Sequence, residues 1–125
     1  MSSRILDYLY IIVTIIATVY GQLILKWRMN DLGALPQGAL SKLSYLIYLV
    51  FDPWIFSGFF AAFLASLAWM AAMTRFDLSH AYPFMSLNFV LVLILSGWLL
   101  NEPVSLHKVL GVALIVIGTV VAARG

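Results

Sequence analysis

A stripe of polar side chains runs along the first apolar segment of this 125-residue chain. Its members follow one another at intervals of four residues: Thr14, Thr18, Gln22 and Lys26. Residues at this spacing share one face of a helix, and polar groups in an apolar setting tend to line a bundle interior or a hydrated path. The stripe therefore predicts one wall of a substrate groove, with Lys26 offering a cation at its end. The alternative is that the threonines bond back to their own helix and Lys26 only anchors the helix end.

A second group of polar side chains lies in a later apolar segment. Asn88 falls near the middle of that segment, where its amide needs either a polar substrate or a neighbouring helix as a partner. Tyr82 and Ser86 share a face one turn apart, nearer one end of the segment. We expect all three to contribute to substrate binding, with a role as an aromatic anchor at the membrane surface as the alternative for Tyr82.

Glu102 is the only glutamate in the chain and directly precedes Pro103. A carboxylate there suits the free N–H groups and the dipole of a following helix, or it pairs with Lys26, or it carries protons. His80 and His107 are expected on opposite sides of a membrane, where they cannot share a metal, and the chain has no cysteine. No catalytic triad, paired carboxylate or phosphate-cradling glycine loop is visible. We therefore expect no enzyme activity, no metal and no other cofactor.

The segments that must position these side chains are long and apolar. Apolar residues make up 64% of the chain and charged residues 10%, against roughly a quarter charged in an ordinary soluble domain. Three uncharged runs are about as long as a helix that crosses a bilayer. A fourth reaches that length if it includes Lys108, whose long side chain can extend its charged end to the membrane surface. None has the period-two alternation of a membrane barrel. The sequence predicts an all-α integral membrane protein with four transmembrane helices.

One membrane domain over residues 1–125 accommodates these spans, which we place at 6–26, 53–74, 81–100 and 104–123. Residues 39–51 gather apolar side chains on one face, which predicts a short helix lying along the interface. Pro53 and Pro103 are expected to begin the second and fourth spans. The short link TRFDLSH is expected to make the second and third spans an antiparallel hairpin.

The last span carries Gly111 and Gly118 seven residues apart, with Ile115 and Ala122 on the same face. Glycines two turns apart let helix backbones approach closely. Four helices are few to enclose a transport path, so we expect a dimer joined along this face. The alternative is packing of the same face within one subunit.

The membrane orientation is weakly specified. Seven cations divide almost evenly between the two expected sides: Arg4, Arg75 and Arg124 on one, and Lys26, Arg28, Lys42 and Lys108 on the other. A difference of one barely biases insertion, so parallel and antiparallel assembly both stay open. No basic run is long enough to follow a nucleic acid.

The motifs of this chain, in their order, resemble those of the small multidrug resistance and drug/metabolite transporter (EamA-like) superfamily. They are GQLILK in the first span, AYPFMSLNF at the start of the third, NEPVS, and the paired glycines of the fourth. Residues 79–118 most resemble the small flippase subunits that move undecaprenyl-phosphate-linked aminoarabinose across the bacterial inner membrane. The resemblance implies a multi-pass protein of that membrane, in a homodimer or in a heterodimer with a similar four-helix subunit.

One departure from the superfamily pattern bears on mechanism. Multidrug exporters of this kind carry a membrane-embedded glutamate three residues before the glycine that matches Gly21, and this chain has Thr18 there. Met85 stands where those exporters carry a tryptophan. Exchange of protons for cationic drugs at that position is therefore not expected.

The main hypothesis is a flippase, or a flippase subunit, for a polyprenyl-phosphate-linked sugar. Lys26 and Arg28 are expected near the phosphate, and Gln22 and Asn88 near the sugar. The complete set of expected substrate-binding residues is Thr18, Gln22, Lys26, Arg28, Tyr82, Ser86 and Asn88. Two alternatives stay open: a small-molecule exporter that lacks the usual glutamate, and a membrane scaffold subunit that transports nothing.

Overall fold

The computed structural model describes the backbone of residues 2–125 and the side chains of residues 5–125. Met1 lies outside it, and so does the side chain of Arg4, one of the seven cations counted above. The described chain is helical throughout, with no strand. Its helices are α1 (Ser2–Leu32), α2 (Ala39–Leu49), α3 (Pro53–Met73), α4 (Leu78–Ala81), the 3-10 helix η1 (Tyr82–Ser86), α5 (Leu87–Leu99) and α6 (Leu106–Arg124). Four stretches of the described residues are long and apolar enough to cross a membrane: Ile5–Leu32, Pro53–Met73, Leu78–Leu99 and Leu106–Arg124. The predicted all-α architecture with four candidate spans is confirmed.

The first helix is longer than the predicted span 6–26. Residues 27–32 contain no glycine or proline, so the helix continues through them to Leu32. Gly33 follows with a φ of 86°, a left-handed conformation that glycine adopts without steric cost and that ends the helix. The short helix α2 lies within the interval 39–51, and its position along a membrane interface stays a prediction.

The last helix begins later than expected. Pro103 lies in an extended segment and does not open α6, which starts at Leu106. Ser105 is the N-cap residue, and its hydroxyl accepts a hydrogen bond from the Lys108 backbone N–H at 3.2 Å. The cap that we assigned to Glu102 is therefore supplied by Ser105, whose hydroxyl is the commoner capping group at that position.

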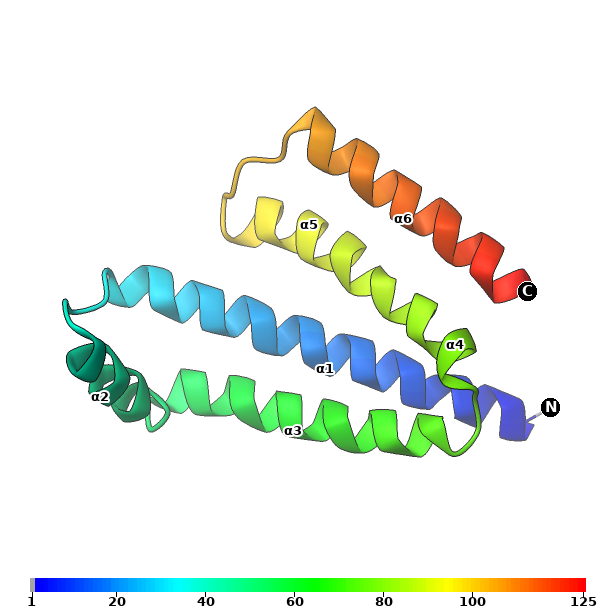
Figure 1. The fold of residues 1–125 in the computed structure, drawn as a ribbon, viewed down its shortest axis with the longest axis horizontal. Helices are drawn as coiled ribbons and strands as arrows, with labels where there is room; N and C mark the ends of the chain where they lie inside the picture. The colour runs from blue at the N-terminus through cyan, green and yellow to red at the C-terminus, as the bar shows by residue number, and fades with distance from the viewer. Residues whose placement is uncertain (1) are drawn as a thin grey trace.

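The helices form two antiparallel pairs (Figure 1). α1 lies alongside α3, α5 lies alongside α6, and the short segments α4 and η1 carry the chain from one pair to the other. Contact between the pairs runs through α5 and η1 against α1. The expected hairpin of the second and third spans is wrong in its packing, because α3 packs chiefly on α1. Both chain termini lie at the end of the bundle opposite α2 (Figure 1).

The contact between α1 and α3 depends on small residues. The buried face of α3 packs on α1 and consists of Ile55, Gly58, Ala61, Ala65 and Ala72. Gly21 and Gly58 meet at the crossing point, where a Cβ added to Gly21 would lie 3.0 Å from the Gly58 carbonyl oxygen. The two backbones are therefore in direct contact, which is possible only because neither residue has a side chain.

A salt bridge ties α1 to α3 at the end where α2 lies. Arg28 Nη2 lies 3.0 Å from Asp52 Oδ1, and Arg28 Nε donates to Asp52 Oδ2 at 3.1 Å. Asp52 is also the N-cap residue of α3, and its Oδ2 accepts from the backbone N–H groups of Trp54 and Ile55. One carboxylate thus caps α3 and holds α3 against α1.

These bonds change the acidity of Asp52. The hydrogen bonds from Arg28 hold the pKa of the Asp52 carboxyl below its ordinary value, although burial alone would raise that pKa. The backbone N–H groups of Ile55 and Trp54 lower the pKa further. A carboxyl with a lowered folded-state pKa stabilises the fold above its unfolded-state pKa, and this contribution is lost as the pH falls through the folded-state value.

We expect Asp52→Ala to lower the melting temperature at neutral pH by several degrees, because the variant loses both the cap and the salt bridge. Below about pH 4 the difference from the parent protein should shrink, since the Asp52 carboxyl of the unfolded parent chain then takes up a proton before that of the folded protein does. Circular dichroism melts in detergent at stepped pH measure both effects. Asp31→Ala is the matched control, because Asp31 also contacts Arg28 but is exposed. Equal losses in the two variants would contradict the assignment.

Candidate functional site

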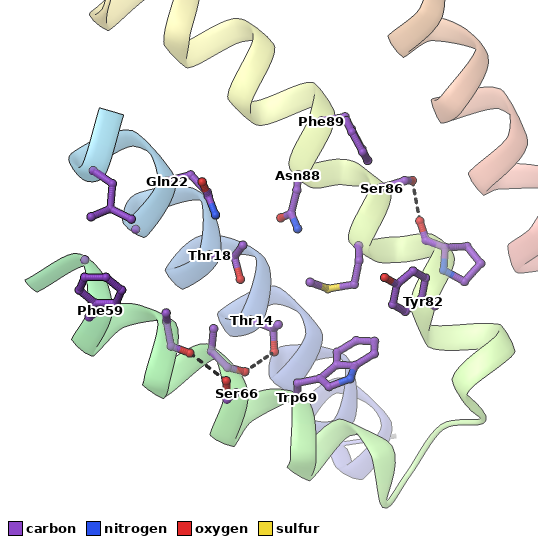
Figure 2. Close-up of a pocket in the computed structure, with 17 residues that line it drawn as sticks. Thr14, Thr18, Gln22, Phe59, Ser66, Trp69, Tyr82, Ser86, Asn88 and Phe89 are labelled. Atoms are coloured by element: carbon purple, nitrogen blue, oxygen red, sulfur yellow. Dashed lines mark hydrogen bonds between the residues drawn. The ribbon is translucent and has the colours of Figure 1, made fainter. Parts of the chain in front are cut away.

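A cavity of about 680 Å3 opens between α1, α3 and the segment η1–α5. Its polar lining residues are Thr14, Thr18 and Gln22 of α1, Ser66 of α3, and Tyr82, Ser86 and Asn88 of η1 and α5 (Figure 2). Five of the seven expected substrate-binding residues are therefore brought together: Thr18, Gln22, Tyr82, Ser86 and Asn88. Lys26 and Arg28 are not among its lining residues.

The α1 wall carries the predicted stripe. Thr14 is buried, and its hydroxyl is directed at two carbonyl oxygens: that of Tyr10 in its own helix at 2.8 Å, as the alternative interpretation foresaw, and that of Ala65 in α3 at 3.5 Å. No hydrogen bond joins the side chain of Thr18 or Gln22 to another described residue, and both point into the cavity (Figure 2). These two side chains are the ones on α1 that are available to a ligand.

The η1 wall is shaped by Pro83. Proline has no N–H for a regular helix ladder, and the chain takes a 3-10 conformation over Tyr82–Ser86. The Pro83 carbonyl oxygen accepts hydrogen bonds from the Ser86 hydroxyl at 2.6 Å and from the Thr119 hydroxyl of α6 at 3.2 Å. Ser86 and Thr119 also contact each other. Ser86 is thus engaged in docking α6 on η1, which reduces what it can offer a ligand.

Asn88 lies on α5, two residues after Ser86. Its side chain points from α5 toward Gln22 and Thr18 on the facing wall (Figure 2). Its Oδ1 atom is buried and has no hydrogen-bond partner, the one such side-chain atom found among the described residues.

The α3 wall contains residues that the sequence analysis missed. Phe59, Ser66 and Trp69 line the cavity, and the Trp69 ring meets the Tyr82 ring edge to face at a centroid distance of 6.1 Å. The hydroxyl of Ser66 donates to the Ala62 carbonyl oxygen at 3.1 Å. Their spacings of seven and three residues indicate a shared helix face. The helix is apolar on all sides, however, so the sequence does not distinguish that face from the others.

The cavity lining contains no Asp, Glu, Lys, Arg or His. The nearest cation along the stripe is Lys26, one turn beyond Gln22, and its Nζ lies 3.9 Å from Glu102 Oε2. Of the roles left open for Glu102, the ion-pair contact is the one present. Both side chains are substantially exposed, so this contact is weakly stabilising and leaves Lys26 free to exchange partners.

Arg28 is placed differently from its expected role. It is bound by Asp52 and Asp31, with Nη1 to Asp31 Oδ2 at 2.8 Å. A guanidinium that is already paired with two carboxylates has little positive charge to offer a phosphate. Arg28 thus lies outside the cavity lining and within ion pairs, and its expected place near a phosphate stays a prediction.

The glycine face of α6 is open. A Cβ added to Gly111 or Gly118 would meet no atom within 4 Å, and Ala122 is exposed while Ile115 is half-buried. The face therefore does not serve packing within the subunit at its two glycines. Its use as a dimer seam stays a prediction.

The model of a family described as the EamA-like transporter family matches residues 8–124. A protein of Aeromonas salmonicida, named as a probable 4-amino-4-deoxy-L-arabinose-phosphoundecaprenol flippase subunit ArnE, is 33% identical over 90% of this chain and 93% of its own length. A protein of Erwinia tasmaniensis, named as the probable ArnF subunit of the same flippase, is 37% identical over 88% of each chain. No solved structure matches.

Proposed function

Because the chain belongs to the EamA-like transporter family, we propose that it is a subunit of a flippase that moves a polyprenyl-phosphate-linked sugar. It is a multi-pass protein of the bacterial inner membrane. The relatives' names describe flippase subunits for a lipid-linked amino sugar, which supports both the class of cargo and a transport role without catalysis.

The observation that carries the proposal is the contrast between the cavity and its rim. The lining is largely apolar, and all of its polar side chains are uncharged, which suits the hydroxyl groups of a sugar. The cavity volume falls in the range of small-molecule sites. Lys26 lies one turn beyond the cavity on the same helix face, where a cation can hold the phosphate. The prenyl chain then stays in the bilayer, so only the head group needs a polar path.

The relatives are named as subunits, and we extend the proposal to a dimer. Its partner is a second copy or a similar four-helix subunit, joined along the open face of Gly111 and Gly118. The two glycines allow close approach of a second helix, and none of the described residues occupies the space beside them.

A second candidate is export of a small cationic solute, and the aromatic pair of Trp69 and Tyr82 at the cavity favours it. Aromatic rings bind planar or cationic solutes well. The absence of a carboxylate from the lining gives such a solute no charged partner in the cavity. We therefore rank this candidate below the flippase.

The test is Lys26→Ala in nanodiscs titrated with a polyprenyl phosphate. We expect roughly tenfold weaker binding, because a charge-assisted contact to the phosphate is lost. Lys42→Ala is the matched control, since Lys42 is an exposed cation on α2 at the same end of the bundle. Lys26→Arg should bind nearly as well as the parent protein. Unchanged binding in Lys26→Ala, or an equal loss in the Lys42 variant, would remove Lys26 from the phosphate site.

A further inference from the structure

The Asn88 side chain carries an oxygen atom that receives no hydrogen bond from the described residues. Its Oδ1 is buried and unpartnered, and the side chain points into the cavity (Figure 2). Buried amide oxygens in proteins almost always accept a hydrogen bond, and an unpartnered one is destabilising. An amide oxygen can only accept, so whatever satisfies it must bring a hydrogen-bond donor.

The other polar groups near the cavity do not supply that donor. The Thr14 hydroxyl is directed at the carbonyl oxygens of Tyr10 and Ala65, Ser66 donates to the Ala62 carbonyl oxygen, and Ser86 donates toward Pro83. Thr18 and Gln22 face Asn88 from α1, but neither is bonded to it. The three side chains Thr18, Gln22 and Asn88 thus surround an uncharged space in which no donor of the described residues reaches Asn88 Oδ1.

We propose that Asn88 Oδ1 is the atom that recognises the head group, by accepting a hydrogen bond from a hydroxyl or amino group of the sugar. This inference rests on the proposed function and adds to it the orientation of the lipid head group in the cavity. The phosphate of a glycosylated lipid is a diester, which brings oxygen lone pairs and no hydrogen-bond donor, so it cannot satisfy Oδ1. The sugar therefore points inward to Asn88, and the phosphate stays at the rim beside Lys26.

The same reasoning predicts opposite effects on stability and on binding. Asn88→Leu removes the unpartnered oxygen and keeps the side-chain size, so the protein without ligand should melt no lower than the parent protein. Binding of a glycosylated lipid should weaken by roughly three- to tenfold, the effect of one neutral hydrogen bond. If Asn88 instead served to bond a neighbouring helix or subunit, the same substitution would lower the melting temperature.

The experiment titrates nanodiscs with three lipids: a bare polyprenyl phosphate, one that carries a neutral pentose and one that carries an amino-pentose. The parent protein should bind the glycosylated lipids more tightly than the bare one, and Asn88→Leu should lose that preference while binding the bare lipid equally well. A loss for both sugars identifies a hydroxyl as the donor, and a loss for the amino-pentose alone identifies the amino group. Either pattern supports the proposal.

Ser96→Ala is the matched control, because Ser96 is a buried polar residue of the same helix whose hydroxyl is bonded to the Leu93 carbonyl oxygen, away from the cavity. It should bind all three lipids like the parent protein. Retention of the sugar preference by Asn88→Leu, or a lowered melting temperature without ligand, overturns the role of Asn88 and leaves the flippase proposal standing. Failure of the parent protein to bind any of the three lipids overturns the flippase proposal itself.

Discussion

Gly21→Val is expected to abolish the packing of α1 on α3, and with it most of the detergent-stable protein. A Cβ at this position lies 3.0 Å from the Gly58 carbonyl oxygen, and a backbone atom cannot rotate away as a side chain can. The helices must therefore separate, which breaks the buried contact of Ile15 and Val19 with the neighbouring elements. Overpacking of this kind lowers the melting temperature by about 10 °C or more. Yield, gel filtration and circular dichroism melts measure the loss.

The sharpest comparison uses a single methyl group at two glycines. In an exposed helix interior, Gly→Ala is stabilising by roughly 1 kcal/mol because alanine favours the helix. Gly118 has open space beside it, so Gly118→Ala should raise the melting temperature or leave it unchanged. Gly21→Ala should lower it, since the clash outweighs the gain in helix propensity. Effects of the same sign at both positions would show that the close crossing of α1 and α3 is not what holds the pair together.

The membrane-spanning elements were predictable because they follow from local properties. Length and apolarity are enough to identify four spans, and a spacing of four residues is enough to place Thr18 and Gln22 on one helix face. Neither property says which other helix that face meets. Gly21 and Gly58 are separated by the end of α1, the loop that follows it and α2. Their contact depends on how α1 packs on α3, and the residue pattern of a single helix does not show it.

Arg28 and Ser86 illustrate the same limit for the site. Each has the residue type and the depth that a binding role requires, but each is taken up by a partner far along the chain, Asp52 for Arg28 and Thr119 for Ser86. Sequence spacing could place these polar groups near a membrane surface or a groove. It could not show that their hydrogen-bonding capacity is spent on holding helices together.

Trp69 was missed for the opposite reason. Its helix is so uniformly apolar that no polar stripe separates the face toward the cavity from the face toward lipid. Without such a contrast, the sequence does not indicate which face of the helix is buried. The uncharged character of the cavity, in contrast, was foreseeable from Thr18, since it follows from residue types alone.

Thr18→Glu should convert the cavity from a site for a neutral head group into a site for cations. Thr18 lines the cavity, and no lining residue carries a charge, so a carboxylate there has no competing partner among them. A lipophilic quaternary ammonium compound should bind the variant roughly tenfold or more tightly than it binds the parent protein. Binding should weaken as the pH is lowered, because the protonated carboxyl offers no charge.

The same substitution should weaken binding of polyprenyl-phosphate lipids, since the new negative charge lies one helix turn from Gln22 and two from Lys26 and repels the phosphate. Thr18→Gln is the matched control: it adds a similar length and polarity without charge, so it should gain no affinity for the cation. Fluorescence titrations at stepped pH separate the two variants. Equal cation binding by both, or cation binding that ignores pH, would mean that the missing carboxylate is not what determines the choice of cargo in this cavity.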